Sequence, residues 1–357
     1  MSLTKLDIDR FITTLRTKSK EFNSISNIQL ASMLEETISN INEVAYFWAT
    51  ISSDNKGTTK TPAEGEEWVA GPYAAVLATQ YYRDSLINDA DLNESKYNEE
   101  ENSYKVFPNN MIERISFPFV NAKVYFNKTM SFNDINKYRG FSKRYEIDPS
   151  ITLVLGAGNY SSIPYLDVMY HLVTRKSVIL LKLNPVNEYL KPVFDKVFQN
   201  FIERGYIIVT TGNIDESKYM AQHPGVNHIH LTGSDKTYED IVYGRELSDS
   251  DRKLKQLPKF NSKPITSELG NVTPIIIHPG KWSTSDIKYQ ARKIVTGKLN
   301  NNGFNCISAQ VVVLPDGWGH TDTLIKFIKY YMNKVKDRKA YYPDSIERLQ
   351  KLEKDKS

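Results

Sequence analysis

The sequence has a single cysteine, Cys306, among 357 residues. One thiol cannot form an internal disulfide or supply a metal site made of several thiolates, so we expect a reducing compartment. The first residues, MSLTKLDIDRF, lack the apolar core of a signal peptide and carry acidic residues that a transit peptide avoids. No apolar run approaches the length that spans a membrane. We therefore expect a cytoplasmic protein with no membrane partner.

The chain also lacks a large excess of charge of one sign. Its 46 basic and 42 acidic residues leave a formal net charge of +4. Proteins that bind nucleic acids concentrate lysine and arginine on one face, so this small excess predicts no nucleic-acid partner. The hydrophobic content of 40% and the charged content of 25% are typical of a folded globular protein.

The length predicts more than one domain. We expect an N-terminal helical region at 1–104, a Rossmann-like cofactor-binding domain at 105–263 and a partial catalytic domain at 264–357. Within the first region, five apolar residues recur at helical spacing: Leu34, Ile38, Ile41, Ala45 and Trp48. A second helix is expected at 73–87, followed by short strands at 122–126 and 144–147.

From residue 151 onward, apolar runs alternate with segments of helical periodicity. Four of the runs indicate buried strands: 151–155 (ITLVL), 177–182 (SVILLK), 206–210 (YIIVT) and 226–231 (VNHIHL). Helices are expected between them at 164–174 and 187–203. Continuous apolar strands alternating with helices predict an α/β fold with a parallel sheet covered on both faces. Ligands of such sheets bind at the carboxyl ends of the strands.

A second α/β unit is predicted to begin near residue 264. Strands are expected at 265–269, 274–277 and 307–314, with a helix at 286–299. The segment 344–354 is strongly helical, and the sequence stops soon after it. We therefore expect this second unit to be interrupted.

Three polar features follow the predicted strands. The loop Gly156-Ala157-Gly158-Asn159 begins like a dinucleotide fingerprint but lacks the third glycine, so a simple tight turn explains it equally well. The amide of Asn159 is suited to point at a developing oxyanion. Lys182 ends an apolar strand, where its charge either reaches a ligand or extends to water. The triplet Thr232-Gly233-Ser234 suits a pyrophosphate at a helix start, although such triplets are common.

Two candidate reactive groups lie further along the chain. Glu268 is in the largely apolar run ITSELG, and a carboxylate at the end of a buried strand has its pKa raised by desolvation, which suits a general base. An ion-paired structural glutamate is the alternative. Cys306 follows the polar stretch NNNGFN, and this loop position favours a reactive thiolate over an inert core cysteine. His228 and His230 share one face of a strand without an apparent third ligand, so we expect no metal site.

The order of these features is more informative than any one of them. In chain order they are Asn159, Lys182, Thr232-Gly233-Ser234, Glu268-Leu269-Gly270 and Gly303-x-x-Cys306. Together they resemble the aldehyde dehydrogenase superfamily over residues 105–340.

The resemblance implies a role for each residue. Cys306 would attack the aldehyde carbon, and hydride transfer to the nicotinamide would convert the thiohemiacetal into a thioester. Asn159, with the backbone N–H of Cys306, would hold the oxyanion, and Glu268 would activate the hydrolytic water. Lys182 would bind the adenosine ribose. The implied cofactor-binding set also contains Thr232, Gly233, Ser234 and Leu269, of which Gly233 and Ser234 would lie by the pyrophosphate.

Three features depart from the family pattern. The run Lys182-Leu183-Asn184-Pro185 lacks the acidic residue that usually follows the lysine, so the cofactor is either NAD or NADP. Gly158 replaces the aromatic residue that often precedes the asparagine. Together with the segment 65–68 (GEEW), it resembles the acyl-CoA reductase-like branch. Family members also continue well past the cysteine, so we expect a C-terminally incomplete member.

The sequence therefore predicts NAD(P)-dependent oxidation of an aldehyde to a carboxylic acid through a cysteine thioester. Two alternatives stay open: an acyl-CoA reductase, and a truncated non-catalytic member that binds nucleotide or depends on a partner. The expected partners are a small aldehyde or acyl substrate, and either a second copy of the chain or a complementing chain.

Overall fold

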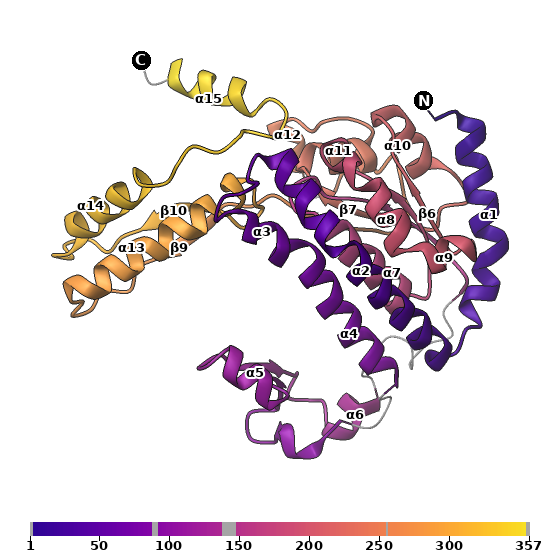
Figure 1. The fold of residues 1–357 in the computed structure, drawn as a ribbon, viewed down its shortest axis with the longest axis horizontal. Coiled ribbons are helices and arrows are strands. Elements are labelled where there is room, and N and C mark those ends of the chain that lie inside the picture. The colour runs from indigo at the N-terminus through magenta and orange to yellow at the C-terminus, as the bar shows by residue number, and fades with distance from the viewer. Residues whose placement is uncertain (1–2, 88–91, 138–147, 255, 355–357) are drawn as a thin grey trace.

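A five-stranded parallel sheet forms the centre of the molecule (Figure 1). This computed structural model describes residues 3–87, 92–137, 148–254 and 256–354. The strands, in spatial order, are β6 (Ile207–Thr210), β5 (Val178–Lys182), β4 (Ile151–Leu155), β7 (His228–Gly233) and β8 (Ile265–Leu269). Strands β4 and β5 are buried along their whole length, which explains their continuous apolar sequence. The predicted α/β class with a Rossmann-like parallel sheet is confirmed.

Helices cover both faces of this sheet. The helices that follow its strands are α7 (Ile163–Thr174), α8 (Lys191–Val197), α9 (Gln199–Glu203), α10 (Ile214–Gln222), α11 (Asp235–Tyr243) and α12 (Asp249–Arg252), with a 3₁₀ turn at Pro185–Leu190. Right-handed crossovers put α7, α8 and α9 on one face and α10 on the other. Helix α1 (Lys5–Asn23) contacts α10 and the sheet, so it belongs to the second face.

The N-terminal helices extend the core of the sheet. Helix α2 (Asn27–Lys56) packs on α8 and α9, and α4 (Ala74–Ile87) packs on α2 and α7 (Figure 1). Their buried side chains share one apolar cluster with the strands, and that cluster includes Ile12 and Trp48. Between α2 and α4 lie the short helix α3 (Glu64–Trp68) and a π-helical turn at Val69–Tyr73. Of the region predicted as helical, residues 3–87 therefore share the core of the parallel sheet, whereas Tyr97–Asn98 and the start of Ser103–Phe107 are strands.

A small antiparallel sheet projects beyond α4 in Figure 1. It contains β1 (Tyr97–Asn98), β2 (Ser103–Phe107) and β3 (Ala122–Tyr125), accompanied by α5 (Met111–Ser116), α6 (Phe132–Lys137) and a 3₁₀ turn at Glu94–Lys96. The strand expected at 122–126 is thus present. The strand expected at 144–147 lies outside the described residues.

A second apolar core forms near the C-terminal end of the described chain. Its elements are β9 (Thr273–Ile276), α13 (Thr284–Leu299), a 3₁₀ turn at Asn300–Gly303, β10 (Ala309–Val313) and α14 (Thr321–Met332), with α15 (Ser345–Lys354) beyond them. β9 and β10 pair in parallel, and α13 packs on α14. The core centres on Ile277, Ile287 and Leu324.

Strand β8, which follows the boundary expected at residue 264, belongs to the main sheet. Strand β8 was expected in the second unit, but it pairs in parallel with β7, with Ile265 opposite Ile229. Ile265 and Leu269 pack against the main core. Pairing with β7 satisfies backbone groups that would otherwise form an open sheet edge. No helix in the described ranges is both long enough and apolar enough to cross a membrane.

One histidine ring is buried without any hydrogen-bond partner. His171 on α7 is 1% exposed, and neither of its ring nitrogens has a partner. Its ring centroid lies 4.9 Å from that of His230. Burial lowers the pKa of His171 to about 3, and the nearby His230, Arg175 and His228 add to this effect. The imidazole is therefore held neutral inside the fold.

We predict that His171→Leu makes the free energy of unfolding fall less steeply as the pH is lowered. The pKa of His171 is lower in the folded chain than in the unfolded one, so the unfolded state binds more protons between the two values. Stability therefore falls as the pH drops below about 6.5. This group alone should contribute a slope of up to about 1.4 kcal/mol per pH unit. Urea unfolding at a series of pH values measures it, with the exposed His278→Leu as control. Equal slopes in the wild type and His171→Leu would contradict the prediction.

Candidate active site

A cavity of about 790 Å³ opens at the carboxyl ends of β4, β5, β7 and β8. Parallel strands place the loops that follow them at one edge of the sheet, so residues distant in the sequence meet there. Seven of the residues singled out in the sequence line this cavity: Asn159, Lys182, Thr232, Gly233, Ser234, Glu268 and Cys306. The eighth, Leu269, packs against the main core instead.

The loop after β4 approaches other parts of the chain very closely. A Cβ atom added at Gly158 would lie 2.5 Å from the hydroxyl oxygen of Tyr342 and 2.8 Å from Oδ1 of Asn184. Asn184 is not free to move away, because its Oδ1 accepts the N–H of Val186 and caps the following turn. Glycine at position 158 is therefore explained by this close contact, and an aromatic residue has no room there.

Lys182 brings a buried cation to the cavity. Its side chain is 6% exposed, and no carboxylate within the described part of the chain forms an ion pair with it. Burial lowers the pKa of Lys182, while Glu188 and Glu216 oppose that shift from a distance. A buried ammonium without a close counter-ion is suited to a polar or anionic ligand.

The triplet at 232–234 joins β7 to α11. The hydroxyl of Thr232 donates to Oδ2 of Asp167 at 2.8 Å, and the hydroxyl of Ser234 accepts the N–H of Thr237 as the cap of α11. Ser234 thereby caps the first turn of α11, and the residues of that turn line the cavity. This is the geometry in which helix starts receive anionic groups.

Glu268 and Cys306 both line the cavity, and both are exposed. Cys306 is exposed on the turn before β10, and its Sγ lies 3.7 Å from Oδ1 of Asn305. Glu268 was expected at the end of a buried strand, and this expectation is wrong. β8 is an edge strand on which alternate residues are exposed, and Glu268 is one of them. Its carboxylate therefore keeps its contact with solvent.

A buried ion pair that contacts the loop of Asn159 was not anticipated from the sequence. Lys56, the last residue of α2, binds Glu67 of α3 through both carboxylate oxygens, at 2.9 and 3.0 Å, and both side chains are at most 3% exposed. Burial lowers the pKa of Lys56, and the carboxylate of Glu67 opposes that shift. A lysine directly before a helix-ending glycine is usually exposed, so no sequence pattern indicates that Lys56 is buried.

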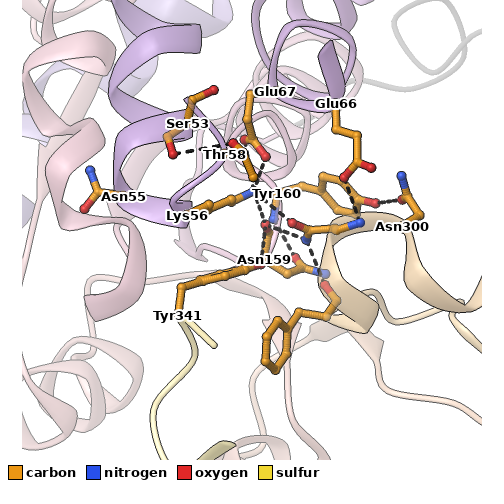
Figure 2. Close-up of polar contacts among 12 residues, drawn as sticks. Ser53, Asn55, Lys56, Thr58, Glu66, Glu67, Asn159, Tyr160, Asn300 and Tyr341 are labelled. Atoms are coloured by element: carbon orange, nitrogen blue, oxygen red, sulfur yellow. Dashed lines mark hydrogen bonds and ion pairs between the residues drawn. The ribbon is translucent and has the colours of Figure 1, made fainter. Parts of the chain in front are cut away.

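The ion pair is connected to the loop that carries Asn159. The backbone carbonyl of Asn159 accepts hydrogen bonds from Lys56 Nζ at 2.9 Å, Asn301 Nδ2 at 3.0 Å and the hydroxyl of Tyr341 at 3.2 Å. Figure 2 shows Lys56 between Glu67 and Asn159, with Tyr341 approaching the same carbonyl. Three segments far apart in the sequence are thus fixed at one backbone atom.

A second set of contacts holds the loop before the cysteine. The N–H of Asn301 donates to Glu66 Oε2 at 2.9 Å, and Arg338 binds both oxygens of that carboxylate at 2.8 and 2.9 Å. The hydroxyl of Tyr160 donates to Asn300 and accepts from Asn305 Nδ2 (Figure 2 labels Tyr160 and Asn300). Burial raises the pKa of Tyr160 to about 12, so the phenol stays protonated. Bidentate arginine–carboxylate pairing gives this contact a defined geometry.

This arrangement brings a thiol, a carboxylate and an amide to one cavity next to a buried cation. A thiol can form a covalent bond to a carbonyl carbon, and a carboxylate can take a proton from water. The described residues contain no group of three or more histidine, cysteine, aspartate or glutamate side chains placed to hold a metal ion.

Sequence comparison identifies related proteins over part of the chain. The aldehyde dehydrogenase family model matches residues 174–344. A curated relative is the N-succinylglutamate 5-semialdehyde dehydrogenase of Sphingopyxis alaskensis, which is 26% identical over 127 residues. That alignment covers 36% of this chain and 23% of the relative.

Solved structures of aldehyde dehydrogenases share the fold. One is the KauB aldehyde dehydrogenase of Pseudomonas aeruginosa, with a TM-score of 0.62 and 12% identity over 94% of this chain and 56% of the other. Another is the NADP-dependent glyceraldehyde-3-phosphate dehydrogenase of Bacillus halodurans, complexed with NADP, with a TM-score of 0.58 and 16% identity over 94% and 58%. A third is the betaine aldehyde dehydrogenase of Staphylococcus aureus in complex with NAD+, with a TM-score of 0.61 and 14% identity over 94% and 56%.

The chain spans less than two thirds of the length of these relatives. The family match begins inside α7 and runs through the cysteine loop to the segment before α15. The shared fold extends the likeness to nearly the whole chain. Residues 174–344 thus match the aldehyde dehydrogenase family, and nearly the whole chain shares the fold of solved aldehyde dehydrogenases.

Proposed function

We propose that this chain binds NAD or NADP in the cavity and oxidises an aldehyde to a carboxylic acid through Cys306. The observation that carries the proposal is the joint presence of Cys306, Glu268, Asn159 and Lys182 around one cavity. These residues come from four different loops or strand ends, and packing of the apolar core alone does not require them to meet.

The lining of the cavity fits a dinucleotide. Lys182 offers a buried cation without a counter-ion, which suits the adenosine ribose, and Gly233 and Ser234 offer a helix start for the pyrophosphate. Thr232 supports that turn through Asp167. Leu269 packs against the main core and does not line the cavity, so its contribution is to hold β8 in place. Position 184 holds an uncharged asparagine in place of a carboxylate. The site therefore accepts NAD and NADP alike, because no negative charge at this position repels the ribose phosphate of NADP.

The side chains supply the covalent chemistry. The thiolate of Cys306 attacks the aldehyde carbon, and the carbonyl oxygen becomes an oxyanion. Oδ1 of Asn159 accepts the N–H of Tyr160 at 2.9 Å, whereas its Nδ2 forms no hydrogen bond with any described residue and stays available to that oxyanion. When bound, the nicotinamide serves as the hydride acceptor. Glu268 then takes a proton from the water that attacks the thioester, and its exposure gives it access to that water.

An exposed apolar surface favours a second candidate, a nucleotide-binding member that depends on a partner. On the two-stranded sheet, Ile276, Val311 and Val313 are 74%, 43% and 46% exposed. Contiguous apolar surface of this kind usually marks an interaction site. Light scattering distinguishes the two candidates, because a well-behaved monomer that turns over aldehyde would exclude this second one.

We predict that the purified chain forms NAD(P)H in the presence of an aldehyde and that Cys306→Ala abolishes this activity. Asn159→Ala should lower kcat about 100-fold, because one oxyanion donor contributes a factor of that order. The measurement is the absorbance of the reduced nicotinamide over a panel of aldehydes. NAD(P)H formation that survives Cys306→Ala would rule out the proposed mechanism.

We also predict that Lys182→Met weakens binding of NAD or NADP at least about tenfold. A hydrogen bond to a charged group contributes about 1.5–3 kcal/mol, and each 1.4 kcal/mol corresponds to tenfold in affinity. Titration calorimetry with each nucleotide measures this change without requiring turnover. The matched control is Lys326→Met, which removes an exposed lysine on α14 away from the cavity. If both variants bind like the wild type, the cofactor assignment is wrong.

A further inference from the structure

The Lys56–Glu67 ion pair differs from the other ion pairs of the described chain in its burial. Lys56 is 3% and Glu67 is 2% exposed at the side chain, while every other described pair of lysine or arginine with a carboxylate has at least one partner more than 20% exposed. Removing two charges from water is rarely repaid by their attraction alone, and apolar residues of similar volume often stabilise a fold more. The pair therefore calls for an explanation other than stability.

The ammonium group of Lys56 uses all of its donors. They bind the carboxylate of Glu67, the backbone carbonyl of Asn159 at 2.9 Å and Oδ1 of Asn301 at 3.2 Å. Its Nζ also lies 5.5 Å from the ring centroid of Tyr160 and 5.3 Å from that of Tyr341, within the range of cation–π attraction. An ammonium with three committed donors has one position, and its partners are fixed relative to it.

Two of these partners, Asn159 and Asn301, belong to the loops that carry the candidate reactive groups. Asn159 has its amide at the cavity, and Asn301 opens the loop that ends at Cys306. The side chain of Asn301 is itself fully used, because Nδ2 donates to Asn159 and to the carbonyl of Phe304 at 2.9 Å. Lys56 therefore joins the two loops directly, and it is not among the residues that line the cavity.

The cysteine loop has a backbone that depends on such support. Asn301, Asn302 and Gly303 have φ values of 51°, 55° and 77°, so three consecutive residues lie in the left-handed region. Asparagine and glycine enter this region more readily than other residues, but two consecutive asparagines in it still carry a conformational cost that their contacts must offset. For Asn301, that support comes from Lys56, Asn159 and Glu66. Loss of these contacts would let the loop change its conformation, and Cys306 would then no longer have a fixed orientation.

We propose that Lys56, neutralised by Glu67, is a positioning residue that sets the Asn159 amide and the Cys306 thiol against the same carbonyl group. The inference rests on the proposed function, because it assigns Cys306 and Asn159 to one reaction. Glu67 allows Lys56 to be buried as a cation, and Tyr341 strengthens the hold on the Asn159 carbonyl.

The test separates attack on a carbonyl from the reactivity of the thiol itself. In acylation by p-nitrophenyl acetate, the Cys306 thiolate forms a bond to the carbonyl carbon and p-nitrophenolate leaves, while the thiol proton passes to solvent. This step needs an oxyanion donor, but it needs no nucleotide. Alkylation by iodoacetamide displaces iodide at a saturated carbon and needs no oxyanion donor. The ratio of the two rates therefore reports on the placement of Asn159 relative to Cys306.

We predict that the double variant Lys56→Met/Glu67→Leu loses about 10- to 100-fold in acylation rate while the alkylation rate and its pH profile stay unchanged. The double variant should still fold cooperatively, because an apolar pair replaces a buried ion pair, and thermal unfolding measures this. Adding Asn159→Ala to this double variant should lower the acylation rate little further. Both changes remove the same contribution, which is the hydrogen bond from the Asn159 amide to the oxyanion. The matched control is Lys123→Met/Glu101→Leu, which removes an ion pair in the small antiparallel sheet and should change neither rate.

Tyr341→Phe provides the test if the double variant does not fold. It removes one donor to the Asn159 carbonyl without changing any charge, and acylation should fall about threefold with alkylation unchanged. Wild-type acylation rates in the folded variants would overturn the positioning role. A wild-type chain that is alkylated at Cys306 but never acylated would instead overturn the proposed function.

Discussion

The carbonyl oxygen of Asn159 is the point on which the candidate site depends. It accepts hydrogen bonds from the end of α2, from the loop before Cys306 and from the segment after α14, at 2.9 to 3.2 Å. These donors lie more than 100 residues from Asn159 in the sequence. The parallel sheet brings the loops to one edge, but the sheet alone does not fix their separation. The buried ammonium of Lys56 fixes the separation of these loops, and Glu67 makes the burial of that ammonium possible.

Contacts between loops also form the wall of the cavity. Gly158 lets Tyr342 and Asn184 approach the β4 loop, and Tyr342 in turn stacks on Phe304 at a ring distance of 5.4 Å. The segment after α14 thus contacts both the loop of Asn159 and the loop of Cys306. Its Arg338 also binds Glu66, which holds the backbone of Asn301. The cavity wall is a connected set of contacts in which each loop restrains its neighbour.

The sequence predicted the sheet because its strands are buried on both faces and therefore uniformly apolar. Strands β4 to β7 match the predicted runs closely, and the polar residues after them do line one cavity. The assignment of β8 failed because an apolar run does not reveal which strand it pairs with. The expectation of a buried Glu268 failed for a related reason. The run around it resembles that of a central strand, but β8 lies at the edge of the sheet.

Lys56 could not be predicted for a different reason. Its partners are a carboxylate 11 residues away, a backbone carbonyl 103 residues away and an amide 245 residues away, and no local pattern relates these positions. Burial of a lysine is decided by tertiary contacts alone.

The central claim is that a thiol, an amide and a carboxylate act together on one carbonyl group. The most direct measurement is mass spectrometry of the chain after acid quenching of a reaction with an aldehyde and NAD(P), on a Glu268→Gln variant in which thioester hydrolysis is slowed. We expect an acyl group on the peptide that contains Cys306, formed only when both the aldehyde and the nucleotide are present. An unmodified Cys306 under these conditions, or an adduct that forms equally without nucleotide, would contradict it.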